Sequence, residues 1–271
     1  SYDIDTDIAK CICEFLDVKS LVNFVASCKT FHTQFQYLSG THHLDITYLS
    51  TSQLVVKCDL TEAMIYNIIE SNLVIYNCHF TISKTMSIQH STAIFVNCSF
   101  HTQFKADVFH CTNSQLQFIN SKFVLSNKLG KGISSEIRMT NCHVSSKMKT
   151  HPLLVLRLSS AFCDTVTTKG GNVFCFVNGR PDFFSFRNCH CSSEHGVEWH
   201  NCRLQTTNIT NCNATKDFSV TTTNTNHFFK PWLSSLFLSN NTGDAFEIGH
   251  TSSNSFITGY VGNISINAPQ V

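Results

Sequence analysis

The most regular feature of the chain is an alternation of apolar and polar positions that ends at an asparagine and recurs along the sequence. Apolar residues stand four and two positions before the asparagine and again three positions after it, as in Leu73, Ile75, Asn77 and Phe80. Alternation with a period of two predicts strands with one buried face. The asparagine interrupts this alternation, so we expect a bend between two strands at each such position.

These bends recur at a nearly fixed distance. The predicted structural bend residues are Asn77, Asn97, Asn120, Asn141, Asn188 and Asn211. With Lys57 placed before them, the anchors at 57, 77, 97, 120, 141, 188 and 211 are 20, 20, 23, 21, 47 and 23 residues apart. The longest step is close to two repeats, and Cys163 stands where the skipped anchor is expected. A period of 20–25 residues indicates stacked copies of one small unit, a solenoid.

The unit resembles a rung of a right-handed parallel β-helix, in which three short strands wind around a dry core. Asparagine tolerates the left-handed backbone of a one-residue bend, and stacked asparagines can hydrogen-bond from rung to rung. We therefore predict a mainly β fold, a right-handed single-stranded parallel β-helix of about nine rungs over residues 46–271. Its last recognisable rung contains Leu236, Leu238 and Asn240.

The first 45 residues follow a different pattern. Apolar residues at spacings of three and four, such as Ile8, Ile12, Phe15 and Leu16, predict two or three short amphipathic helices. Residues 7–21 resemble the opening of an F-box, and residues 25–31 resemble its closing Val-x-x-Cys-Lys-x-Phe motif. The family usually opens with Leu-Pro, where this chain has Asp3-Ile4-Asp5.

The F-box resemblance implies a function. The helices at 1–45 would dock on the Skp-type adaptor of a cullin–RING ubiquitin ligase, and the solenoid would hold a protein substrate. The implied partner-binding residues are Ile4, Ile8, Ile12, Phe15, Leu16, Leu21, Cys28, Lys29 and Phe31. A second interpretation stays open, because terminal helices also cover the exposed strand edges at solenoid ends.

An alternative function is structural. The chain also resembles viral β-helix proteins, which assemble side by side as homotrimers in capsid-cementing or spike proteins. In that case the partners would be other copies of this chain and capsid proteins, and the location would be the virion. The mass of the protein in solution separates a trimer from a monomer.

The composition of the chain limits which cellular compartment and which classes of partner we expect. Most of the 14 cysteines occupy one equivalent inward position per rung, which indicates buried, reduced thiols and hence the cytoplasm or nucleus. The formal net charge is +1, and no basic stripe is evident in the sequence, so we expect no nucleic-acid partner. No apolar run is long enough to predict a membrane span.

The sequence also lacks the chemistry of an enzyme. Polysaccharide-cleaving β-helices need clustered carboxylates, but between residues 71 and 160 only Asp107 and Glu136 are acidic. We therefore expect no catalytic residues. Residues 189–202 hold three cysteines and three histidines, but the spacing matches no standard zinc pattern, so we expect neither a metal nor a cofactor. Residues 215–235 interrupt the repeat and are either a contact loop or a cover for the flank of the solenoid.

Overall fold

The computed structural model describes the chain in part. Its backbone is described at residues 35–38, 43–50, 53–57, 62–103, 105–171, 173–178, 183–191, 195–200, 203–210, 212–214, 217–222, 232–239, 247–250 and 260–267. Side chains are described at 46–50, 54–56, 64–103, 105–171, 174–178, 184–191 and 212. Residues 1–34, which contain most of the predicted helical module, lie outside the described residues.

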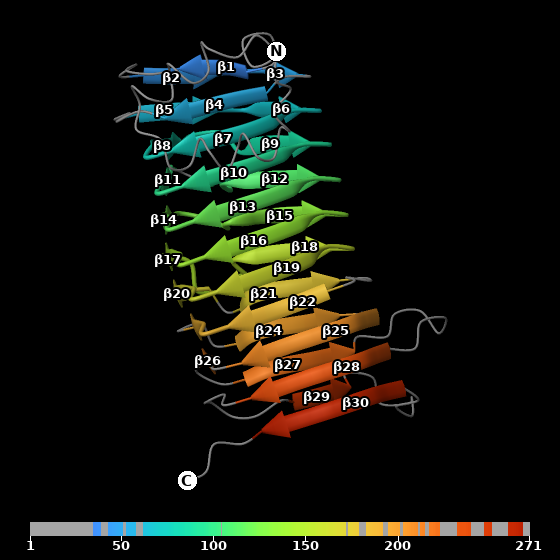
Figure 1. Ribbon diagram of the computed structural model, residues 1–271. Helices are drawn as coiled ribbons and strands as arrows, with labels where there is room; N and C mark the ends of the chain where they lie inside the picture. The colour runs from blue at the N-terminus through green and yellow to red at the C-terminus, as the bar shows by residue number, and fades with distance from the viewer. Residues whose placement is uncertain are drawn as a thin grey trace, which may run out of the picture.

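The described chain is mainly β and forms a parallel β-solenoid (Figure 1). Sheet A contains β1 (Phe35–Leu38), β4 (Gln53–Lys57), β7 (Asn72–Tyr76), β10 (Thr92–Val96), β13 (Gln115–Ile119), β16 (Glu136–Thr140), β19 (Ser160–Asp164), β22 (Phe183–Arg187), β25 (Arg203–Thr210), β28 (Trp232–Ser239) and β30 (Tyr260–Asn267). Sheet B contains β2 (His43–Ile46), β5 (Glu62–Ile65), β8 (His79–Ile82), β11 (Ser99–Thr102), β14 (Lys122–Leu125), β17 (His143–Ser146), β20 (Thr167–Lys169), β23 (His190–Cys191) and β26 (Asn213–Ala214). Sheet C contains β3 (Leu49–Ser50), β6 (Asn67–Ile69), β9 (Met86–Gln89), β12 (Phe109–Thr112), β15 (Gly130–Ile133), β18 (Leu154–Arg157), β21 (Val173–Asn178), β24 (His195–His200), β27 (Asp217–Thr222) and β29 (Glu247–His250).

The chain visits sheets A, B and C in turn, so each strand pairs with the strand one rung away. Residues 64–191, where side-chain description is most complete, make about six such turns. No helix occurs among the residues that the structure describes. The predicted parallel solenoid is therefore confirmed in this part of the chain.

The strands extend beyond both ends of the pattern seen in the sequence. β1 pairs in register with β4, Phe35 opposite Gln53, and so lies before the predicted boundary at residue 46. β30 pairs with β28, one strand further than the rung that contains Leu236. The sequence missed these strands because neither is followed by the bend asparagine that marks most other rungs.

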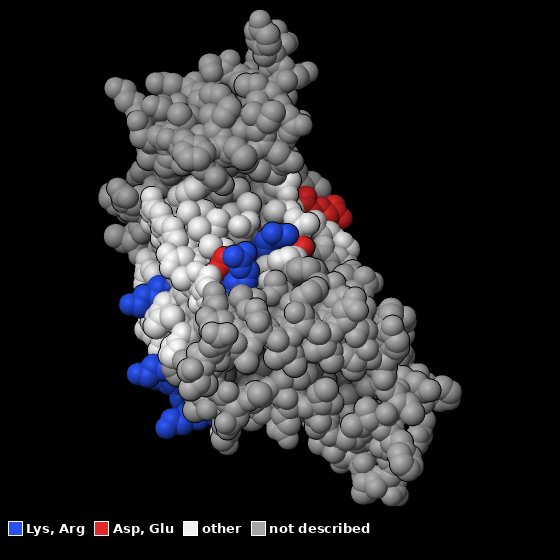
Figure 2. Space-filling model, turned by 60° about the horizontal axis from the view of Figure 1, so that its bottom comes forward, with Lys and Arg blue, Asp and Glu red and all other residues white. Residues whose placement is uncertain are grey.

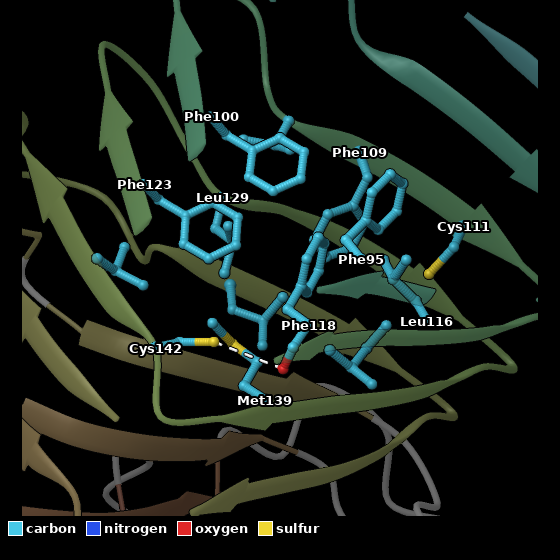
Figure 3. Packing of buried hydrophobic residues seen from close by; sticks show 14 of the residues in the cluster. Phe95, Phe100, Phe109, Cys111, Leu116, Phe118, Phe123, Leu129, Met139 and Cys142 are labelled. Carbon is cyan, nitrogen blue, oxygen red and sulfur yellow. Dashed lines mark hydrogen bonds between the residues drawn. The ribbon is translucent and has the colours of Figure 1, made fainter. Parts of the chain in front are cut away.

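Stacked phenylalanines fill the core between sheets A and B (Figure 3). The rings of Phe80, Phe100 and Phe123 lie parallel, with centroids 4.8 and 4.9 Å apart. Phe95 and Phe118 form a second stack at 5.4 Å and meet the first stack edge to face. All five side chains are buried. The stacks repeat at the strand spacing of a sheet, so parallel pairing itself brings equivalent rings into contact.

A glycine makes room for one of these rings. Gly130 lies opposite Phe109 in register between β12 and β15. A Cβ on Gly130 would lie 2.8 Å from the Phe109 ring and 2.4 Å from its carbonyl oxygen. Any larger residue would therefore displace the Phe109 ring or the strand.

The bend between sheets A and B follows a single column of residues with left-handed backbone. Asn77, Asn97, Asn120, Asn141 and Asn188 have φ between 50° and 57°. The skipped rung is supplied by Thr165, with φ of 57°. Cys163, which the sequence placed at that anchor, instead pairs in sheet A with Met139 and Phe186 and points inward. Asn211 lies outside the described residues.

A second column of bends, between sheets C and A, was not predicted. Its residues are Glu70, His90, Asn113, Ser134 and Leu158, with φ between 49° and 52°. The sequence hides this column because only one of the five positions is an asparagine. Each bend residue is followed by a buried serine, at 71, 91, 114, 135 and 159.

The side chain after each described bend of the two columns, except Val166 after Thr165, closes the corner with a hydrogen bond. In the second column, the Ser91 hydroxyl donates to the Gln89 carbonyl over 2.6 Å and accepts from the Ser71 N–H over 3.0 Å. In the first column a thiol takes this place, as where Cys98 donates to the Val96 carbonyl over 3.3 Å. Cys142 also reaches the Phe118 carbonyl at 3.5 Å (Figure 3). Buried backbone groups at the corners are thus paired from rung to rung.

The described cysteines are buried thiols that form no disulfide. Burial raises the pKa of Cys98, Cys111 and Cys191 to about 12 and that of Cys142 to about 11, from an ordinary 9.0. A buried, protonated thiol is unreactive and behaves as a small apolar group.

Candidate interaction surface

The outer face of sheet B is flat and polar. Pairing of β8, β11, β14, β17, β20 and β23 aligns one outward column: His79, Ser99, Lys122, His143, Thr167 and His190. A second outward column contains Thr81, His101, Val124, Ser145 and Lys169. His79 Nδ1 lies 2.6 Å from Ser99 Oγ, and His143 Nδ1 lies 2.7 Å from Thr167 Oγ1. Contacts between neighbouring rungs therefore orient two of the histidine rings.

The loops that lead from sheet B to sheet C add a lysine at almost every rung. We call the outer face of sheet B and these loops the basic flank. Its charged or titratable surface residues are Lys84, Lys105, Lys122, Lys128, Lys147, Lys149, Lys169, His79, His101, His143, His151 and His190. All are exposed except Lys128, which is half-buried.

Hydrogen bonds stack these loops on one another and so align their lysines. The Gln103 N–H donates to the Ile82 carbonyl over 2.8 Å, and the Asn127 side chain donates to the Lys105 carbonyl over 2.7 Å. One rung further, the Lys147 N–H donates to the Leu125 carbonyl over 3.2 Å. Lysines on neighbouring loops are therefore gathered on the same flank of the solenoid.

Between β8 and β23, no exposed carboxylate among the described side chains lies on the basic flank. The acidic residue in these loops, Asp107, is 6% exposed and is already bonded to His110 Nε2 at 2.9 Å and Asn127 Nδ2 at 2.8 Å. On sheet A, by contrast, Arg138 is paired: it contacts Glu136 and lies over the Phe162 ring, 4.3 Å from its centroid. Figure 2 shows basic side chains along the left edge of the molecule, apart from the acidic ones.

Sheet A carries a surface of another kind near its first strands. Val55, Val74 and Tyr76 occupy outward positions, alternating with inward residues such as Leu54 and Ile75. Their exposed fractions are nevertheless only 3, 6 and 5%. Further along the sheet, Arg138 and Thr140 at equivalent outward positions are exposed. Val55, Val74 and Tyr76 therefore form a covered apolar patch on the outer face of β4 and β7.

The structure places some of the predicted site residues and not others. The nine predicted partner-binding residues, from Ile4 to Phe31, lie outside the described residues. In the cysteine- and histidine-rich segment, Cys189 and Cys191 are buried whereas His190 between them is exposed, so the three do not share a face. Within the described ranges, no group of His, Cys, Asp and Glu is arranged to hold a metal ion. No helix of these residues is long and apolar enough to cross a membrane.

The basic flank corrects the expectation that the chain has no basic stripe. Its lysines are separated by a whole rung in sequence, at 84, 105, 128, 149 and 169, and never form a run. Only the winding of the chain brings them into a column. The sequence nevertheless contains a pattern that indicates this flank, because these lysines recur with the same period as the bend asparagines.

Fold and surface together define the class, a parallel β-solenoid protein with one basic flank. Comparison of the chain with protein-family models, with curated proteins and with solved structures gave no match. The function is therefore argued from the residues and geometry of this chain.

Proposed function

We propose that the chain is a non-enzymatic protein-binding scaffold, an F-box-type substrate adaptor of a cullin–RING ubiquitin ligase. The observation that carries the binding role is the basic flank, a largely exposed surface built from sheet B and from the loops of successive rungs. In this proposal a right-handed solenoid of about nine rungs holds the substrate. In this proposal a helical module within residues 1–34 engages the Skp-type adaptor through Ile8, Ile12, Phe15 and Leu16, because residues 35–38 and 43–46 are strands of the solenoid.

The covered face of sheet A supports a helical module packed against the solenoid. Residues 1–34 lead directly into β1, which lies beside β4 in sheet A. Amphipathic helices in this segment supply apolar side chains that suit Val55, Val74 and Tyr76. A module seated there holds its adaptor-binding residues at a fixed position relative to the rod.

The cysteines support a reducing compartment, the cytoplasm or nucleus. Nine cysteines among the described residues are buried and form no disulfide, although stacked rungs bring several of them near one another. Proteins of oxidising compartments commonly join such cysteines in disulfides. Ubiquitin ligases of the cullin–RING type act in the reducing compartments.

Co-purification of the full chain with a Skp-type adaptor tests the proposal. Phe15→Ala combined with Leu16→Ala is expected to abolish co-purification, because it removes the apolar contact that the F-box resemblance implies. The matched control is Ile133→Ala with Leu158→Ala, which truncates two exposed apolar residues of the rod and leaves the module intact. Adaptor binding that survives the first double substitution contradicts the proposal.

Light scattering tests the competing structural role. A scaffold that works as an adaptor is expected to be a monomer of 30.4 kDa when alone. A stable species of about 90 kDa, three copies of the chain, would instead favour the trimeric viral capsid or spike protein.

A further inference from the structure

The lysines of the basic flank gather like charge along one side of the solenoid. Lys105, Lys128 and Lys147 come from consecutive loops that hydrogen bonds hold in a stack. Like charges held on neighbouring strands repel one another, and nearby carboxylates normally offset such repulsion. Here the loop carboxylate, Asp107, is buried and already paired with His110 and Asn127. Asp107 therefore does not neutralise these lysines, and an anionic ligand could do so.

The face beside this column supplies hydrogen-bonding groups. Outward positions on β8 to β23 hold histidine, serine and threonine among the lysines, and Val124 is the apolar exception. These groups bind carboxylates through N–H and O–H donors once a ligand displaces surface water. The surface is thus suited to a ligand that carries several anionic groups along an extended chain.

The composition of the flank favours an acidic polypeptide over a nucleic acid. Single-stranded nucleic acids are usually held by aromatic side chains on which the bases stack. The outward positions of β8, β11, β14, β17, β20 and β23 contain no aromatic residue other than histidine. The flank also has lysine throughout and no arginine, so it lacks the planar fork that pairs with phosphate.

We propose that the basic flank binds an acidic segment of a partner protein, lying along the rod across successive rungs. This assignment names the chemistry of the substrate and rests on the proposed function as a protein-binding scaffold. An extended peptide rises about 3.3 Å per residue and rungs stack at about 4.8 Å, so a segment of about five residues spans the loops from Lys84 to Lys149. Flexible lysine side chains accommodate the difference between peptide and rung spacing.

Fluorescence anisotropy with the full chain tests the assignment. The probe is a fluorescein-labelled peptide of about 12 residues that alternates glutamate and serine, compared with a peptide that has glutamine in place of glutamate. We expect the acidic peptide to bind, its affinity to fall as salt rises from about 50 to 300 mM, and the glutamine peptide not to bind. Absence of acidic-peptide binding at low salt overturns the assignment.

Matched variants locate the site. Lys105→Ser with Lys147→Ser is expected to weaken binding of the acidic peptide by about fivefold or more. The control, Arg138→Ser with Arg157→Ser, removes the same charge from sheets A and C and is expected to change affinity by less than about twofold. Lys105→Arg with Lys147→Arg keeps the charge and should retain binding. Equal losses in the flank and control variants would show a non-specific charge effect and overturn the assignment.

Two further measurements test the choice of partner and the independence of the flank from the helical module. Single- and double-stranded oligonucleotides of about the same charge are titrated in parallel, and tighter binding of either than of the acidic peptide overturns the choice of partner. The flank variant is also tested for co-purification with the Skp-type adaptor, which it should retain. Failure of the peptide to bind therefore refutes the flank assignment, whereas failure of the adaptor to bind refutes the proposed function.

Discussion

Asn141 donates its side-chain amide to the side-chain oxygen of Asn120, one rung away, over 2.9 Å. Its backbone N–H donates to the Asp164 carbonyl on the other side, also over 2.9 Å. One residue thus links three rungs while it holds a left-handed φ of 50°. Conformation and hydrogen bonding both favour asparagine at this bend.

Replacing Asn141 with valine should destabilise the protein. The left-handed backbone costs a branched side chain about 1–2 kcal/mol, and the link to Asn120 is lost. Urea denaturation of the variant is expected to show a loss of about 2 kcal/mol. Thr140→Val, at the exposed outward position just before the bend, should change stability by less than about 0.5 kcal/mol. Equal effects at 140 and 141 would contradict the role of the bend.

At Thr165, by contrast, we expect a substitution that increases the stability of the protein. Threonine holds φ of 57° there, a conformation that its branched side chain disfavours. Thr165→Asn should therefore raise the free energy of unfolding by about 1 kcal/mol. Thr165→Ala keeps a Cβ in the left-handed region and gives a smaller gain. An asparagine variant no more stable than the alanine variant would show that this strain is relieved elsewhere.

The sequence predicted the parts of the fold that use a distinctive residue. Asparagine is the usual non-glycine choice for a left-handed bend, so Asn97 and its counterparts revealed the column between sheets A and B. The second column escaped notice because Glu70, His90 and Ser134 carry no such preference. The buried serines that follow it look like ordinary surface residues in a chain rich in serine.

The basic flank was hidden for a different reason. Lys105 and Lys128 are distant in sequence, and their proximity depends on the number of residues in each rung. Net charge averages over the whole chain and conceals such a column. Once the period is known, however, lysines spaced by one rung predict it, and the same reasoning applies to other β-solenoids.

Ser114→Ala tests the hydrogen bonds made by the buried serine that follows each bend between sheets C and A. The Ser114 hydroxyl donates to the Thr112 carbonyl over 2.7 Å and accepts from the Ser91 N–H over 3.2 Å. Alanine leaves a buried N–H without a partner, which costs about 1–3 kcal/mol. Thermal unfolding of the variant should shift down accordingly. Ser145→Ala, on the outer face of sheet B, is the control and should leave the midpoint nearly unchanged.

The raised thiol pKa values predict a loss of stability in alkali. Unfolded thiols lose their protons above about pH 9, whereas folded Cys98 and Cys111 keep theirs until about pH 12. The unfolded state therefore binds fewer protons in this window, and stability falls as the pH rises from 9 towards 12. Between pH 8 and 10 each such thiol should cost about 1 kcal/mol. Urea midpoints measured at both pH values check this result.

A variant separates the thiols from other groups that titrate in alkali. Cys98→Ala with Cys111→Ala should unfold more easily at pH 8 but should lose less further stability at pH 10. An unchanged pH dependence would show that lysines or tyrosines cause the alkaline loss. In the native protein at pH 8, buried thiols should also resist iodoacetamide, as mass spectrometry of the digested protein would show.

A charge introduced on the covered outer face of sheet A should destabilise the protein. Val74 and Gln117 occupy the same outward column, two rungs apart, but Val74 is 6% exposed and Gln117 is half-buried. A lysine at Val74 must either bury its charge or displace whatever covers the strand, so Val74→Lys should cost about 2–3 kcal/mol in urea denaturation. Gln117→Lys adds the same charge at a half-open position and should cost less than about 0.5 kcal/mol. Similar small losses for both would mean that the cover over β7 contributes nothing to stability, which would also remove the support this face lends to a packed helical module.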